Sequence, residues 1–145
     1  HPRRAVWMAL AGPAANLVLV LLAALLIRVG LEWGFFEPPY SLNMSHITDG
    51  VGGRFSELCA ALVSIVFSLN LLLLTFNLLP LPPLDGSNIP FFFLSPDAAE
   101  KYRALMWNPT VQVIGLLVAF RGFGKIFPLI QDFAVNLLYP GISYS

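Results

Sequence analysis

The stretch NLLPLPPLDG, residues 77–86, separates two apolar blocks, and the rest of the chain is organised around it. It ends a run without a single charged residue from Leu58 to Leu84. The three prolines at positions 80, 82 and 83 stop any helix, because proline lacks the amide donor and pushes the preceding residue towards extended conformations. We therefore expect an extended, proline-rich segment that carries one carboxylate, Asp85, between the two apolar blocks.

The composition is typical of a membrane protein. The 145 residues are 57% hydrophobic and 11% charged, whereas soluble domains average about 25% charged residues. The eight Lys and Arg residues balance the eight Asp and Glu residues, so nothing in the charge pattern indicates nucleic-acid binding. We predict an all-α fold, a polytopic membrane helix bundle in which residues 1–145 form a single membrane domain.

Two apolar runs are long enough to cross a membrane. Residues 5–27 follow two arginines, and residues 58–79 lead into the proline-rich stretch. At about 1.5 Å per residue, either run spans the roughly 30 Å hydrocarbon layer as a helix. Pro13 in the first run is expected to kink that helix or to mark a late start. Residues 28–57 are expected to form a loop, in which His46 is a solvent-exposed histidine.

The C-terminal part predicts one interfacial helix and further short spans. A Ser-Pro pair at positions 95 and 96 is a helix-start signal, and the helix is expected over about residues 96–107 at the membrane surface. Two ion pairs are expected on its polar face, Asp97 with Lys101 and Glu100 with Arg103. Residues 110–138 are predicted to hold one or two short apolar helices, 110–120 and 128–138, separated by a turn at 121–125.

Asp85 is the candidate functional residue. An Asp-Gly pair is a common turn, and a purely structural turn is the plain alternative. At membrane depth, however, non-helical backbone is tolerated only where it is buried in protein or lines a cavity, and an ionisable group there marks a functional site. A charged carboxylate among apolar residues needs a cation or hydrogen-bond donors. A metal ion supplies such a charge, and an aspartate oxygen is a good zinc ligand.

Residues 77–86 also resemble the second signature of the site-2 protease family of intramembrane zinc metalloproteases, Asn-x-x-Pro-x-Pro-x-x-Asp-Gly. Residues 11–16 (AGPAAN), shortly after two arginines, are similar to the Ala-Gly-Pro-x-x-Asn segment of the compact bacterial members. The order and the separation of the two segments also agree with that family. The resemblance therefore covers most of the chain.

The resemblance implies a zinc ion held by two histidines of a His-Glu-x-x-His helix and by a third ligand, an aspartate, which Asp85 matches. Asn77 matches the motif asparagine, whose implied role is to bind the substrate strand or the developing oxyanion. The implied activity is that of a zinc metalloendopeptidase with membrane-spanning protein substrates. The implied location is the lipid bilayer, as a multi-pass protein of the bacterial cytoplasmic membrane.

The chain departs from the family at one point. It contains no His-Glu-x-x-His, and neither of its histidines, His1 and His46, precedes a glutamate. We therefore interpret the chain as the C-terminal portion of a longer protease, without the catalytic helix and inactive by itself. The alternative is a catalytically inactive polytopic membrane protein that binds or assembles single membrane helices.

Overall fold

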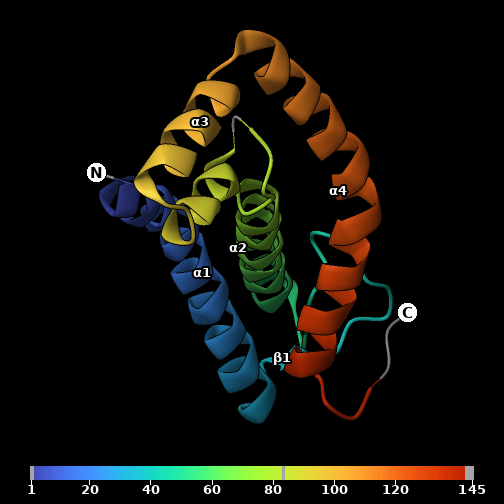
Figure 1. Ribbon diagram of the computed structural model, residues 1–145. Helices are drawn as coiled ribbons and strands as arrows, with labels where there is room; N and C mark the ends of the chain where they lie inside the picture. Colours follow the sequence, from blue (N-terminus) through green and yellow to red (C-terminus); the bar gives the residue numbers. More distant parts are fainter. Residues whose placement is uncertain (1, 83, 143–145) are drawn as a thin grey trace. The chain divides into compact units, whose positions relative to one another are not determined.

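The computed structural model describes residues 2–82 and 84–142, and most of them are helical (Figure 1). The α-helices are α1 (Pro2–Glu32), α2 (Arg54–Asn77), α3 (Pro96–Met106) and α4 (Pro109–Leu138), and a 3-10 helix, η1 (Asp85–Phe92), lies between α2 and α3. The strands β1 (Phe36–Glu37) and β2 (Asp49–Gly50) pair antiparallel in the loop between α1 and α2. The fold is thus mostly helical, with a small hairpin that the all-α prediction does not include.

Three of these helices are long and apolar enough to cross a membrane: Leu10–Glu32 of α1, all of α2 and all of α4. Each exposes large apolar side chains along its length, such as Leu25 on α1, Leu62 on α2 and Leu117 on α4. Contiguous apolar surface of this kind is unfavourable in water and is satisfied by lipid. The architecture agrees with the predicted polytopic membrane protein.

The chain forms two compact units, each made of segments that are distant in sequence. Unit 1 comprises His1–Ala15 and Leu73–Phe127, and unit 2 comprises Asn16–Leu72 and Pro128–Ser145. The helices α1, α2 and α4 each continue from one unit into the other. Asp85 and the residues around it belong to unit 1.

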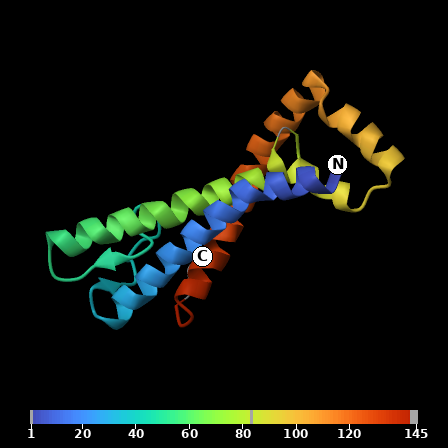
Figure 2. The same cartoon turned by 90° about the vertical axis from the view of Figure 1, so that its left-hand side faces the viewer.

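Within unit 2, α1 and α2 pack against each other through small and apolar side chains (Figure 2). Ala23 of α1 is buried, and together with Leu22 and Leu26 it lines a cavity whose other wall includes Leu62 and Val66 of α2. Small residues allow two membrane helices to approach closely, and this packing replaces the hydrophobic effect, which is weak between helices in lipid.

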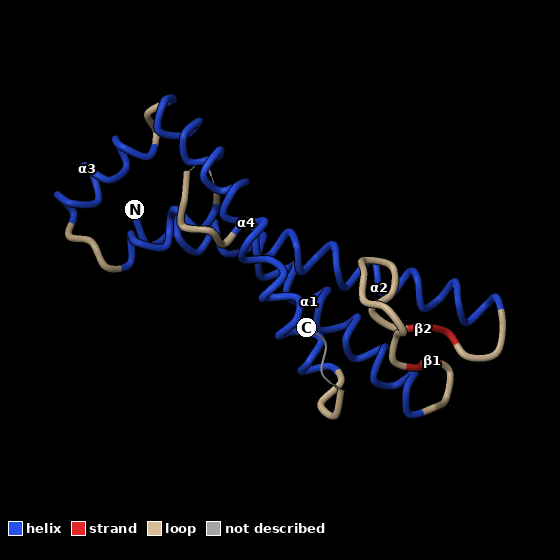
Figure 3. The backbone as a smooth tube through the Cα atoms, turned by 90° about the vertical axis from the view of Figure 1, so that its right-hand side faces the viewer, coloured by secondary structure: helices blue, strands red, loops and turns tan. Residues whose placement is uncertain are grey.

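Hydrogen bonds hold the loop between α1 and α2 in place within unit 2. Its strands β1 and β2 are drawn red in Figure 3. The Ser64 hydroxyl of α2 accepts bonds from the backbone amides of Ile47 (3.0 Å) and Thr48 (3.1 Å). The Tyr139 hydroxyl donates to the carbonyl of Ile47 at 2.7 Å. The buried backbone of this loop is thus satisfied by side chains from α2 and from the residue that follows α4.

The turn predicted at residues 121–125 is wrong, because α4 continues through these residues as one helix. Phe120 and Phe123, three residues apart, both contact the ring of Phe76 on α2, with centroids 5.3 and 5.4 Å away. Residues three apart share a face only if the helix is unbroken. An apolar surrounding also favours a helix over a turn, since the helix satisfies its own backbone polar groups.

The structure also corrects the predicted start of the first helix. Because α1 begins at Pro2, Pro13 lies inside the helix and does not mark its start. The helices α1 and α2 also extend into the loop predicted over residues 28–57, which they shorten at both ends. The helix α3 begins at Pro96, with the Ser95 side chain accepting a bond from the amide of Ala98 (3.3 Å), as its start signal indicates.

Candidate functional site

Asp85 is half-buried and is the first residue of η1, eight positions after α2 ends at Asn77. The described backbone between them bends more than the extended strand that we expected. The amide of Leu81 donates to the carbonyl of Leu79 (2.8 Å), and the amide of Leu84 donates to that of Leu81 (2.9 Å). The prolines leave few amides in this segment, and the remaining ones find acceptors by turning back on the chain.

These turns return the chain to the end of α2. A Cβ atom at Gly86 would collide with the backbone carbonyls of Leu78 and Leu79. Gly86 is buried, and it is required here by this close approach of two backbone segments. The Asp85–Gly86 pair therefore lies beside the residues that directly follow Asn77.

The helix α1 contributes to the same site in unit 1. A Cβ atom at Gly12 would lie 3.6 Å from Oδ2 of Asp85, which is ordinary van der Waals distance. The carboxylate thus lies next to a stretch of α1 that has no side chain. The two segments that the sequence analysis singled out, around Gly12 and around Asp85, meet in space.

The helix η1 is fixed to its neighbours by hydrogen bonds and aromatic contacts. The Ser87 hydroxyl donates to the carbonyl of Leu84 (2.7 Å), and the Tyr102 hydroxyl of α3 donates to the carbonyl of Ser87 (2.6 Å). The ring of Tyr102 also meets Phe91 edge-on at 5.2 Å. Partial burial raises the pKa of the Tyr102 phenol above its ordinary value, which keeps the phenol protonated and able to donate.

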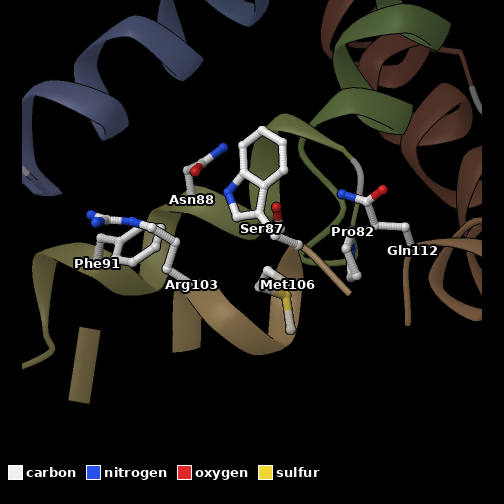
Figure 4. A pocket seen from close by; sticks show the side chains of 8 residues that line it. Pro82, Ser87, Asn88, Phe91, Arg103, Met106 and Gln112 are labelled. Atoms are coloured by element: carbon white, nitrogen blue, oxygen red, sulfur yellow. The ribbon is translucent and has the colours of Figure 1, made fainter. Parts of the chain in front are cut away.

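A cavity of about 240 Å³ lies beside η1 (Figure 4). Its walls come from the proline-rich segment, η1, the end of α3 and the start of α4. They consist of Pro82, Ser87, Asn88, Phe91, Arg103, Met106, Trp107 and Gln112. The only formal charge among these residues is that of Arg103.

The sequence pattern predicts an ion pair of Arg103 with Glu100 and gives no signal that Arg103 belongs to a site. Neither of the two ion pairs expected on α3 forms among the described residues. The Arg103 guanidinium instead lies over the ring of Phe91, 5.5 Å from its centroid. No sequence signal connects these two residues, because they belong to separate elements whose docking is a tertiary event.

The described residues do not form a zinc site by themselves. No three His, Cys, Asp or Glu side chains among them are grouped so as to hold a metal ion. His46 is exposed, as expected, and pairs with Asp49 in unit 2, with Nδ1 2.8 Å from Oδ1. A catalytic zinc needs three protein ligands, and Asp85 offers one.

The fold and the site define a mostly helical protein with three helices able to cross a membrane and a carboxylate placed where a proline-rich segment interrupts the helices. No protein-family model, curated protein or solved structure matches the chain. Any assignment of function therefore depends on the residues and contacts described above.

Proposed function

We propose that this chain is part of an intramembrane zinc metalloprotease that hydrolyses peptide bonds of membrane-spanning substrates. The observation that carries the proposal is the meeting of Gly12, Asp85 and the end of α2 in unit 1. These are the segments in which the chain resembles the site-2 protease family. They lie in contact although they are far apart in the chain, which supports a shared role for the two segments.

In this proposal Asp85 is the one zinc ligand that the chain contributes. Asp85 is half-buried, and its carboxylate lies beside Gly12, a position of α1 that carries no side chain. The proposal requires further ligands, because among the described residues no three His, Cys, Asp or Glu side chains are grouped to hold a metal ion. The working site lies in the bilayer, and we assign the intact protein to the bacterial cytoplasmic membrane.

Asn77 is proposed to bind the substrate backbone. It is the last residue of α2 and is half-buried, and the Asp85–Gly86 pair approaches this end of the helix. A carboxamide offers both donors and an acceptor to an unwound peptide. A membrane-spanning substrate must lose helical hydrogen bonds before its peptide bond is accessible, so such a partner lowers the cost of unwinding it.

The experiment is Asp85→Asn in the intact protease. A neutral amide is a poorer partner for a dication than a carboxylate, so zinc content should fall and proteolysis should decrease by about 100-fold or more, with the bundle still folded. Zinc is measured by mass spectrometry of the purified protein and proteolysis on a tethered membrane substrate. The matched control is Asp97→Asn, at an exposed carboxylate in the first turn of α3, which should leave both unchanged.

Asn77→Ala separates substrate binding from metal binding in the same protein. It should reduce turnover while zinc content stays at the wild-type level. Full zinc content and full proteolysis in Asp85→Asn would reduce Asp85 to a turn residue, because Asn-Gly turns form as readily as Asp-Gly turns. An intact protein that binds single membrane helices without zinc would instead support the inactive helix-binding alternative.

A further inference from the structure

We propose that the cavity beside η1 binds the headgroup phosphate of an anionic phospholipid, with Arg103 as its principal contact. This inference is independent of the proposed protease activity, because no residue assigned to zinc or to the substrate lines the cavity. It depends on the chemistry of the walls, on the size of the cavity and on its place along the chain.

The walls favour an anion. Arg103 supplies the only formal charge, and the structure gives it no acidic partner among the described residues. The other walls carry neutral donors, namely the amides of Asn88 and Gln112 and the indole N–H of Trp107, and the Asn88 amide also donates to the carbonyl of Asp85 (3.4 Å). No carboxylate lines the cavity, so nothing in its walls competes for the guanidinium.

The guanidinium is also held in a geometry that suits a phosphate. Figure 4 shows the Arg103 side chain lying across the ring of Phe91. A guanidinium stacked on an aromatic face keeps the N–H groups at its edges available for other acceptors. Phosphate oxygens match this planar fork with two parallel hydrogen bonds.

The place of the cavity along the chain favours a lipid as the source of the phosphate. Its volume of about 240 Å³ is below that of sites for drug-sized ligands, which begin near roughly 300 Å³, so it suits a headgroup and not a whole lipid. The cavity lies between the last turn of α3 and the first turn of α4, where a membrane-spanning helix begins. Exposed Val113, Ile114 and Leu117 follow Gln112 within about a turn and offer apolar contacts for acyl chains.

The test measures retained lipid by native mass spectrometry of the 145-residue chain, released from nanodiscs that contain equal amounts of phosphatidylglycerol and phosphatidylcholine. The wild-type chain should retain phosphatidylglycerol preferentially. Arg103→Gln should weaken this retention roughly tenfold, the usual effect of losing a charge-assisted hydrogen bond. Gln112→Leu should weaken it by a smaller factor and keeps the test valid if Arg103→Gln fails to fold.

Lys101→Gln is the matched control, since it removes an exposed positive charge from the same helix outside the cavity. It should leave retention within about twofold of wild type, because Lys101 does not line the cavity. Equal losses in Lys101→Gln and Arg103→Gln, or no loss in Arg103→Gln and Gln112→Leu, would overturn the site. Equal retention of phosphatidylcholine and phosphatidylglycerol by the wild-type chain would overturn the assignment to an anionic lipid.

Discussion

At the scale of single residues, the site depends on the absence of a side chain at position 86. Gly86 lets the backbone around Asp85 pack against the carbonyls of Leu78 and Leu79. We expect Gly86→Ala to cost about 1–3 kcal/mol of unfolding free energy, because backbone must move to admit the Cβ atom. Thermal unfolding of the chain in detergent micelles measures this. Gly122→Ala, at a helical position with open space around it, should be neutral or slightly stabilising, and an equal loss there would contradict the explanation.

Tyr102 gives the same region a pH dependence. Its pKa is raised in the folded state, so the folded chain holds the phenolic proton more tightly than the unfolded chain. The resulting stabilisation is complete below the ordinary tyrosine pKa of about 10 and is lost as the pH rises above it. Tyr102→Phe should therefore flatten the alkaline decrease in melting temperature. It should also cost about 1 kcal/mol at neutral pH through the lost bond to Ser87.

The control for this prediction is Tyr40→Phe, because the Tyr40 ring is 99% exposed. It should keep both the wild-type stability and the wild-type alkaline slope, both measured by circular dichroism across the alkaline range. An unchanged alkaline decrease in melting temperature in Tyr102→Phe would show that other groups cause this decrease.

At the scale of elements, two buried serines of α2 differ in their hydrogen bonds. Ser64 and Ser68 are both buried one turn apart, but Ser64 accepts bonds from two loop amides, whereas the Ser68 hydroxyl has no partner among the described residues. Ser64→Ala should cost about 2 kcal/mol or more, since the amides of Ile47 and Thr48 stay buried and unpaired. Ser68→Ala should be neutral or stabilising by up to about 1 kcal/mol.

The measurement is again thermal unfolding, complemented by amide hydrogen exchange of the loop. Ser64→Ala should accelerate exchange at residues 47 and 48, and Ser68→Ala should leave it unchanged. Similar destabilisation by both substitutions would show that the volume of the side chain, and not its hydrogen bonds, decides the stability of this contact.

At the scale of the whole molecule, the small number of grouped metal-binding side chains limits the chemistry of the isolated chain. Asp85 is one carboxylate, and the described residues contain no group of three metal-binding side chains. We expect the isolated 145-residue chain to bind zinc weakly and to hydrolyse no peptide, because a catalytic zinc site needs three protein ligands. Zinc analysis after a chelator wash measures the first point. Stoichiometric zinc retained by the chain would contradict this expectation.

The sequence by itself determined where most helices lie and where they are interrupted. Long uncharged runs specify membrane-length helices, the serine before Pro96 starts α3, and the prolines after Asn77 end α2. Each of these signals acts within a few residues, through backbone donors, caps and side-chain polarity. The choice of Asp85 as the candidate residue also came from local sequence.

Only the tertiary structure decided which distant residues meet. The contact of Gly12 with Asp85, the position of Arg103 over the Phe91 ring and the unbroken course of α4 across Phe120 and Phe123 all depend on packing between separate elements. Local propensity carries no information about such partners. At residues 121–125, packing overrode the local preference for a turn. Residues 121–125 form a helix because the rings of Phe120 and Phe123 both pack on Phe76 and because an apolar surrounding requires the backbone to satisfy its own hydrogen bonds.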